Sequence, residues 1–553
     1  MIGRCQGRLR KTAACLVAAA LVAAVSAAAG TPGWTAPKDA LVVGVPSDPE
    51  HFNALLANNS STFSAAWSIF DCLVAYDENL SIKPALAQSW DVSRDGLSYT
   101  FHLRPNVLWH DGQPFTADDV AFWVSALLNP KVRAPSRAFY GAFAGYAALT
   151  DPDHPADPAS LPKKPVEVLG PLTVRLNLAF PYAPFLDVLS CPGGTIVPKH
   201  VLEGQDINTA EFNTRPIGTG PFRMTEWRKG DHFTLQAFDR YYGGAPALRQ
   251  VVFATIPDPV VRAQALKAGQ IDVLDTPLYD DLPVYARDPR LALIGGYTTL
   301  YWYLGFRVDR PVFSDLRLRQ AISYGVNFDV IVRKVFGDNA VRATGPIPPN
   351  NWAYTPRVRL YPYNPAKAKQ LLAEAGYTPG PDGVMQKDGR PLAFAIKTIN
   401  TDQSLHDVIV IIQSQLALIG VQAQVQLLDT ATILRQMFSS DFDAILEGWN
   451  GHIDPDPINY TVWHSSQWNT RNILHYKNPE VDRLLDDARA ALDQGRRRAL
   501  YARFQQVLAD DAPTVWGYYP KRIYVYEKQL RGLTFIPLQG GVYPSLRRAK
   551  WQP

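Results

Sequence analysis

The pattern of apolar and polar positions in the first part of the chain predicts short strands, tight turns and a capped helix. Residues 40–45 (ALVVGV) form an apolar run before a proline, which indicates a first buried strand. Residues 98–108 predict a strand pair or an irregular strand, closed by a turn at residues 110–112. A helix is predicted next, because Thr116 is a suitable N-cap and Asp119 completes the spacing of a capping box.

The second half of the chain alternates strand-like and helix-like segments. Residues 392–397 are typical of a strand, 403–419 of an apolar-periodic helix that ends before a glycine, and 421–428 of an alternating strand. This order is a βαβ unit, which predicts a mostly parallel sheet. The alternation continues with two helices and a strand, over residues 479–491, 495–510 and 518–526.

The length and composition indicate a folded protein with more than one lobe. At 553 residues the chain is too long for a single compact core, so two or three structural lobes are expected. The hydrophobic fraction of 47% and the charged fraction of 19% fit a folded soluble protein and argue against disorder.

The first 29 residues are typical of a secretory signal peptide. Four basic residues open the chain, an Ala-rich apolar run covers residues 12–29, and residues 27–29 offer an A-x-A cleavage site. The alternative is an uncleaved membrane anchor, which the scarcity of Leu and Ile in the run disfavours. Loss of the four basic residues takes the formal charge from +4 to 0 (4 − 4), so no nucleic-acid surface is expected.

The cysteines leave one disulfide as an open alternative. Cys5 and Cys15 fall in the predicted signal peptide, so Cys72 and Cys191 remain in a compartment that permits disulfides. They form either a bridge or two buried thiols, because the sequence does not show whether they lie close together.

The sequence carries no strong signature of catalysis or metal binding. It contains no H-E-x-x-H, G-x-S-x-G, C-x-x-C or phosphate-loop motif. One S-x-x-K pair, Ser160 and Lys163, lies in a proline-rich loop predicted over residues 151–165, where chance explains it best. Spacings of twelve and eleven residues do not place metal ligands on one helix turn for three histidines, His452, His464 and His475. We therefore expect no catalytic residue, no metal site and no cofactor.

Aromatic residues gather in three short stretches. Each stretch fits either ordinary core packing or the lining of one cleft between lobes, where ligands prefer to bind. The stretches contain Trp449, Tyr460, Trp463 and Trp468, then Tyr301, Trp302 and Tyr303, and finally Tyr518 and Tyr519.

Several segments together resemble one protein family, in order and over nearly the whole predicted mature chain. The chain resembles the bacterial extracellular solute-binding proteins of family 5, the dipeptide, oligopeptide and nickel type, which deliver ligands to ABC importers. The motifs are specific in combination, although each alone is weak. They are PALAQSWDVSRDGLSYTFHLRPNVLWHDGQPFTADDV (84–120), PIGTGPFRM (216–224), FSDLRLRQAISYGVN (313–327), YNPAKAKQLLAEAGY (363–377), YKNPEVDRLLDDARA (476–490) and a helical run that ends at residue 513.

The resemblance implies an α/β fold with two lobes around a central ligand cleft. This is the type II-like fold of periplasmic binding proteins, with an extra inserted subdomain, and its lobes close by a hinge motion. The implied division is a signal peptide at 1–29, a discontinuous lobe I at 30–83, 210–305 and 515–553, an inserted subdomain of lobe I at 84–209, and lobe II at 306–514.

The resemblance also implies where the ligand binds. In peptide-binding members, the loop that corresponds to residues 448–454 carries an aspartate that pairs with the ligand's α-amino group. His452 stands at the aligned position here, so either Asp454 or Asp456 takes that role or the ligand lacks a free amine. Arg307 is a second departure, and it either binds a ligand carboxylate or phosphate or is a surface residue. The ligand-binding candidates are Trp449, Asn450, His452, Asp454, Tyr301, Trp302, Arg307, Tyr518 and Ser47.

The expected function is that of a periplasmic binding protein that captures a peptide or peptide-like ligand. Its expected partners are the ligand and the permease subunits of an ABC importer, and the protein itself is expected to be a monomer. The same transport role for an amine-free or acidic solute, such as an opine-like compound or a sugar derivative, is an alternative that His452 and Arg307 motivate. A metal complex as ligand and a secreted hydrolase are the remaining alternatives, and the absence of catalytic motifs makes the hydrolase remote.

Overall fold

The structure is a computed structural model, and it describes residues 39–57, 60–77, 79–190, 192–468, 470–538 and 540–552. The predicted signal peptide at 1–29 lies outside these ranges and stays a prediction. Cys191 also lies outside them, so the predicted choice between a disulfide and two thiols is not tested. Within the described ranges, no helix combines the length and the apolar character that a membrane crossing requires.

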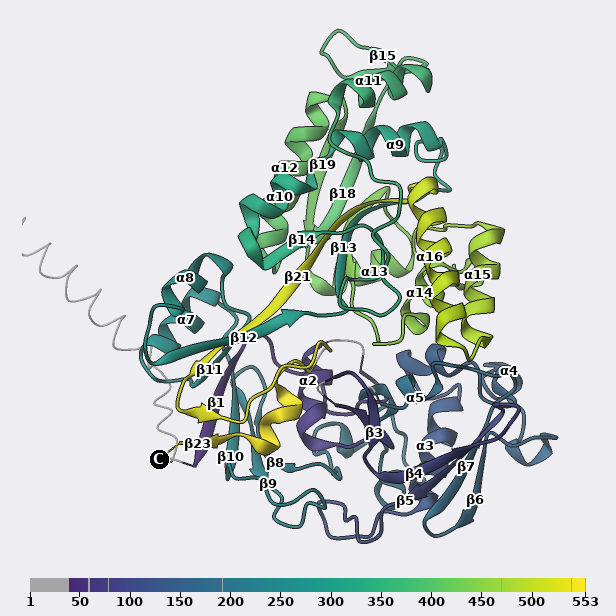
Figure 1. Ribbon diagram of the computed structural model, residues 1–553, viewed down its shortest axis with the longest axis vertical. Helices are drawn as coiled ribbons and strands as arrows, with labels where there is room; N and C mark the ends of the chain where they lie inside the picture. The colour runs from purple at the N-terminus through teal and green to yellow at the C-terminus, as the bar shows by residue number, and fades with distance from the viewer. Residues whose placement is uncertain are drawn as a thin grey trace, which may run out of the picture.

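One mixed sheet runs through both lobes and forms the frame of the molecule (Figure 1). Among the described residues it has twelve strands, ten of them on one continuous path. In spatial order these ten are β19 (Gln422–Leu428), β18 (Ala393–Ile399), β20 (Ala444–Trp449), β13 (Tyr301–Phe306), β21 (Thr514–Glu527), β11 (Val273–Asp275), β1 (Ala40–Val45), β10 (Gln250–Thr255), β9 (His232–Ala237) and β8 (Phe222–Arg228).

The long strand β21 belongs to both lobes. Its first half pairs with β13, where Trp302 lies opposite Tyr518, and with β14 (Ala340–Arg342). Its second half pairs with β11 and with β12 (Leu291–Tyr297). We call the side with β1 and β8–β12 the first lobe, and the side with β13, β14 and β18–β20 the second lobe. The chain therefore passes between the lobes twice, between β12 and β13 and within β21.

The helices of the second lobe cover both faces of its part of the sheet. One face buries side chains such as Leu304 and Leu446 against α9 to α12, and the other buries Tyr303 and Ile445 against α13 to α16. Because both faces are covered, the strands are apolar at successive positions. These helices are α9 (Leu316–Gly325), α10 (Phe328–Val335), α11 (Pro365–Glu374), α12 (Gln403–Leu418), α13 (Thr430–Phe438), α14 (Asp456–Trp463), α15 (Pro479–Ala490) and α16 (Gln494–Asp511).

The predicted βαβ unit is confirmed in this lobe, but the predicted mostly parallel sheet is wrong, because β13 pairs antiparallel with both β20 and β21 and β14 pairs antiparallel with β21. β18 and β19 are parallel neighbours, with Ala393 opposite Gln422, and α12 connects them. The helix begins at the N-cap Asp402, whose side chain accepts a hydrogen bond from the backbone N–H of Ser404. Gly420 follows the helix with φ +80°, a conformation that favours glycine.

The first lobe carries a separate four-stranded sheet. Its strand order is β4 (Ala87–Val92), β5 (Ser98–Leu103), β7 (Thr173–Asn177) and β6 (Val166–Gly170). The helix α3 (Ala117–Leu128) packs on β6 and β7, and its predicted capping box between Thr116 and Asp119 is present. The segment predicted as a strand over residues 98–108 keeps this form only to Leu103.

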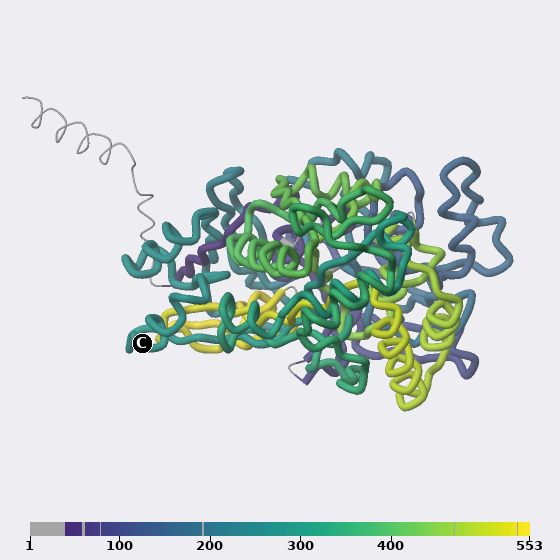
Figure 2. Tube along the Cα trace, turned by 90° about the horizontal axis from the view of Figure 1, so that it is seen from above, coloured from purple at the N-terminus to yellow at the C-terminus, as the bar shows by residue number. Residues whose placement is uncertain are grey.

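The remaining elements of the first lobe surround this framework, and both ends of the described chain lie here. β1 (purple) and the C-terminal segments (yellow) lie together in two perpendicular views (Figures 1 and 2). They include α2 (Ser60–Ile69), β2 (Val74–Tyr76), η1 (Pro135–Tyr140), α5 (Phe185–Val188), α7 (Pro259–Lys267) and η8 (Tyr543–Arg548).

Candidate functional site

The two lobes meet around the segment 449–456, which we call the interface loop. It starts at Trp449, the last residue of β20, and ends at Asp456, the first residue of α14. Pro455 and Pro457 flank the helix start, where proline fits because its fixed φ suits the first turn and no N–H is needed there. The loop is tightly packed, because a Cβ on Gly451 would lie 2.7 Å from the side chain of Ile458.

Asp454 fixes the interface loop to the second lobe. Its two carboxylate oxygens accept hydrogen bonds from Nη1 and Nη2 of Arg497, each at 2.6 Å, and both residues are buried. Desolvation alone would favour the neutral form of Arg497, but the charge of Asp454 outweighs it and raises the pKa of Arg497. The predicted amine-binding candidate Asp454 therefore already has a guanidinium as its partner.

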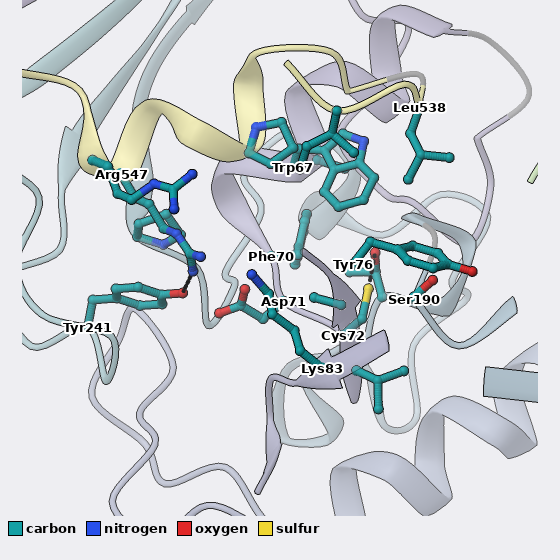
Figure 3. Close-up of a pocket in the computed structure, with 18 residues that line it drawn as sticks. Trp67, Phe70, Asp71, Cys72, Tyr76, Lys83, Ser190, Tyr241, Leu538 and Arg547 are labelled. Carbon is teal, nitrogen blue, oxygen red and sulfur yellow. Dashed lines mark hydrogen bonds between the residues drawn. The ribbon is translucent and has the colours of Figure 1, made fainter. Parts of the chain in front are cut away.

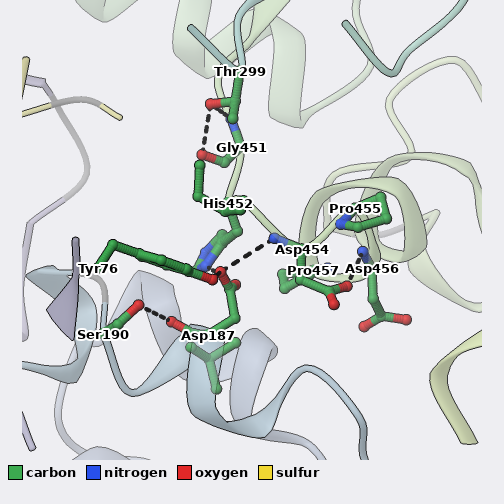
Figure 4. Close-up of polar contacts among 12 residues, drawn as sticks. Tyr76, Asp187, Ser190, Thr299, Gly451, His452, Asp454, Pro455, Asp456 and Pro457 are labelled. Carbon is green, nitrogen blue, oxygen red and sulfur yellow. Dashed lines mark hydrogen bonds and ion pairs between the residues drawn. The ribbon is translucent and has the colours of Figure 1, made fainter. Parts of the chain in front are cut away.

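His452 reaches from the loop to the first lobe (Figure 4). Its Nδ1 lies 2.9 Å from Oδ2 of Asp187, a buried residue on α5. The hydroxyl of Tyr76 on β2 donates to the other oxygen of Asp187, and the backbone N–H of Asp454 donates to the same oxygen at 3.2 Å. Asp187 thus collects hydrogen bonds from both lobes at one carboxylate.

Asp456 makes a second contact between the lobes. Its Oδ2 accepts a hydrogen bond of 2.9 Å from the hydroxyl of Tyr182, which belongs to the first lobe. Arg489 on α15 binds the same carboxylate, with Nη2 3.0 Å from Oδ2, and its guanidinium stacks on the ring of Tyr460. The backbone N–H of Ala183 also donates to the carbonyl oxygen of Arg489 at 3.1 Å.

Aromatic rings and one further arginine complete the interface. Nε1 of Trp449 donates to the hydroxyl of Tyr303 at 2.8 Å, which fixes the indole at the end of β20. Phe139 of η1 contacts the ring of His452 edge to face, with centroids 4.8 Å apart. The guanidinium of Arg471 lies over both Trp449 (5.5 Å to the centroid) and Phe139 (5.2 Å).

An apolar contact lies beside these polar ones. Ile453 of the interface loop packs with Tyr76 and with Ile536 and Leu538 of the C-terminal segment, all of which are buried. Removing such surface from water stabilises the joined lobes by roughly 25 cal/mol per Å².

Of the other predicted ligand-binding residues, Asn450 belongs to the interface loop and Tyr301 lies beside it, whereas Trp302 and Tyr518 lie on the opposite face of the sheet. Asn450 places Oδ1 2.6 Å from the hydroxyl of Thr299, which lies where the chain passes from β12 to β13. Tyr301 is the strand partner of Trp449 and is fully buried next to Tyr303. Trp302 packs on the opposite face of the sheet, where it stacks on Tyr518 with centroids 6.2 Å apart.

Arg307 and Ser47 lie apart from the interface loop. Arg307 follows Phe306 at the other end of β13 from Tyr301, and its Nη2 is 2.8 Å from Oδ2 of Asp309. Ser47 follows β1 in the first lobe, and its hydroxyl is 2.5 Å from that of Ser61. The structure thus brings Trp449, Asn450, His452, Asp454 and Tyr301 together and does not join these two residues to them.

A cavity of about 70 Å³ lies in the first lobe beside the interface (Figure 3). At one side Tyr241 and Arg547 face each other over Asp71, and burial raises the pKa of Asp71 to about 6. At the other side the lining residues Tyr76 and Ser190 both bond to Asp187, at its side chain and its carbonyl oxygen. No lining residue comes from the second lobe.

Sequence reasoning missed the first-lobe half of this interface. Asp187, Tyr182 and Phe139 lie in short helices or connections without a marked hydrophobic period, so no local pattern indicated them. Arg471 follows the aromatic stretch that ends at Trp468, and that proximity was the one signal available. Within the described ranges, no three His, Cys, Asp or Glu side chains are placed to hold a metal ion.

Comparison with known proteins assigns the fold and the family. The sequence model of the bacterial extracellular solute-binding proteins, family 5, matches residues 81–471. The oligopeptide-binding protein AppA of Bacillus subtilis is 31% identical over 508 residues, which covers 90% of this chain and 89% of AppA.

Two solved structures show the same architecture. NikZ from Campylobacter jejuni in complex with Ni(L-His) has a TM-score of 0.82 and 31% identity, and the match covers 93% of this chain and all of that one (100%). AppA from Bacillus subtilis in complex with a nonapeptide has a TM-score of 0.82 and 30% identity, over 93% of this chain and 99% of that chain. The predicted two-lobed α/β fold is confirmed, and the chain belongs to the bacterial extracellular solute-binding proteins of family 5.

Proposed function

We propose that this protein captures a peptide or peptide-like ligand between its two lobes and delivers it to the permease subunits of an ABC importer. The observation that carries the proposal is the interface loop, which leaves the sheet of the second lobe at Trp449 and contacts the first lobe through His452 and Asp456. A ligand enclosed there touches both lobes and therefore favours the closed form. The proposal includes a periplasmic location and a monomeric state.

Closure follows from the way the lobes are connected. Two passages of the chain, between β12 and β13 and within β21, join them, so rotation about these passages opens the contacts at Asp187 and Asp456. A ligand that binds the closed form better shifts the population toward it by its difference in affinity. The closed form is then the one that the permease recognises.

The same role for an acidic or amine-free solute is the second candidate. Its support is the charge pairing of the interface loop, because Asp454 is held by Arg497 and Asp456 by Arg489. His452 occupies the position that resembles the amine-binding aspartate of peptide binders and faces Asp187. A ligand ammonium would have to displace one of these basic side chains from its carboxylate.

Binding of a synthetic library of peptides from two to nine residues tests the first candidate. We expect one or more peptides to raise the melting temperature and to give a saturable heat signal in calorimetry. If no peptide stabilises the protein, the peptide proposal fails and the transport role is then tested with acidic non-peptide solutes. Loss of uptake of the stabilising compound in a strain that lacks this protein tests the delivery step.

A further inference from the structure

Arg471 places a guanidinium at the lobe interface, and no carboxylate of the described part of the chain pairs with it. The other basic residues of this region, His452, Arg489 and Arg497, each lie within 3.0 Å of an aspartate oxygen. Arg471 has no ion pair and no hydrogen bond of its side chain to any of the described residues. Its contacts are the faces of two aromatic rings.

The aromatic contacts orient this guanidinium but do not satisfy its hydrogen bonds. Rings attract the cation through their π electrons, whereas the five N–H groups of arginine need oxygen or nitrogen acceptors. Desolvation lowers the pKa of Arg471 to about 10, so the side chain still carries its charge at neutral pH. Arg471 is half-buried, so part of its guanidinium stays accessible to a partner of opposite charge.

The ring contacts also tie Arg471 to both lobes. Trp449 belongs to the interface loop of the second lobe, and Phe139 belongs to η1 of the first lobe. Phe139 in turn touches His452, so the guanidinium lies beside the residue of the interface loop that contacts Asp187 of the first lobe. Arg471 therefore makes both ring contacts only when the two lobes are joined.

We propose that Arg471 contacts the ligand directly and binds a carboxylate group of it. This inference rests on the proposed ligand-capture function and assigns its ligand class: a solute, peptide or not, that presents a carboxylate to the interface loop. The planar guanidinium donates two parallel hydrogen bonds to a carboxylate, and Trp449 and Phe139 flank it. The side chain of His452, which contacts Asp187, carries no negative charge that would repel a ligand carboxylate.

Matched acids and amides test the inference. Tripeptides are synthesised as free C-terminal acids and as C-terminal amides, with Glu or Gln as the varied side chain, and their binding at pH 7 is measured by calorimetry. The variants are Arg471→Gln and Arg471→Lys. Arg483→Gln serves as the control, because Arg483 is an exposed arginine of α15. Circular dichroism verifies that each variant is folded.

We expect the native protein to bind the preferred acid roughly 10- to 100-fold more tightly than its amide, the range of a hydrogen bond to a charged group. In Arg471→Gln this preference should fall to about 1- to 3-fold, Arg471→Lys should retain part of it, and Arg483→Gln should keep it in full. Equal binding of acid and amide by the native protein overturns the inference. So does an equal loss of both in Arg471→Gln, because that result shows only a packing role between the rings.

Failure of the peptide proposal can be distinguished from failure of the inference about Arg471. If neither acids nor amides of any tripeptide bind, the peptide proposal is contradicted, and the same variants are measured with aliphatic and sugar-derived carboxylic acids and their amides. An acid preference that disappears in Arg471→Gln then supports the inference without peptides. Absence of binding of every carboxylic acid in this second set overturns it.

Discussion

Exchanging His452 for aspartate is the sharpest perturbation of the contact between the lobes. His452 Nδ1 lies 2.9 Å from Oδ2 of Asp187, and the two side chains are only 11% and 4% exposed. The exchange places a second carboxylate against a buried one in the closed form. In the open form the two groups separate, so the substitution acts on the equilibrium between the forms.

The structure gives the size of the effect. The lost charge-assisted hydrogen bond is worth about 1.5–3 kcal/mol. Repulsion of two like charges about 4 Å apart adds about 4 kcal/mol at an effective dielectric constant of 20. Protonation of one of the two carboxyl groups removes this repulsion. At pH 7, protonating a carboxyl group with an ordinary pKa of 3.9 itself costs about 4 kcal/mol, which sets an upper limit on the effect. We therefore expect the closed form to lose at least about 3 kcal/mol, more than a 100-fold shift in population.

Spin labels on the two lobes measure this shift as a distance distribution. We expect the short-distance population of the native protein to disappear in His452→Asp at pH 7. It should return in part as the pH falls toward 5, because protonation of the carboxyl pair then becomes cheaper. His154→Asp, a change in an exposed loop, is the matched control. A His452→Asp protein that is as closed as the native one at pH 7 would refute the contact with Asp187.

Three further predictions follow from the same region. Asp454→Asn should lower the free energy of unfolding by about 3–5 kcal/mol, because it leaves Arg497 buried without its carboxylate, and a loss below about 1 kcal/mol in urea unfolding would contradict the ion pair. Burial raises the pKa of Glu447 from its ordinary 4.5 to about 7. The carboxyl therefore destabilises the fold as the pH rises through this window, by up to about 3 kcal/mol. Glu447→Gln should be more stable than the native protein at pH 8 and equal to it near pH 4, and a pH-independent difference would refute the assignment. Tyr182→Phe should reduce the closed population about tenfold in the spin-label assay through the lost bond to Asp456, and an unchanged distribution would show that this bond does not hold the lobes together.

Helices and strands were predicted well where the residues that determine them lie close together in the sequence. The capping box of Thr116 and Asp119 and the parallel strands around α12 depend on residues a few positions apart or on one hydrophobic period. The last strand is longer than predicted, 14 residues over Thr514–Glu527, because it pairs with strands of both lobes. No property of its own sequence shows that double role.

The polar partners across the interface could not be predicted in the same way. His452 and Asp187 are 265 residues apart, and Asp187 lies on a helix of four residues with no repeating pattern. The sequence drew attention to Arg307 as an unusual charge, but its carboxylate partner Asp309 follows two positions later. Arg471 has no such neighbour, and only the packing of Trp449 and Phe139 around it sets it apart.

A crystal structure of the protein with its tightest-binding compound tests the central claim most directly. The account predicts that the compound is enclosed between the lobes and contacts Trp449 and His452 of the interface loop. A compound bound only in the cavity of the first lobe, beside Asp71 and Tyr241, or bound to lobes that stay apart, would contradict it.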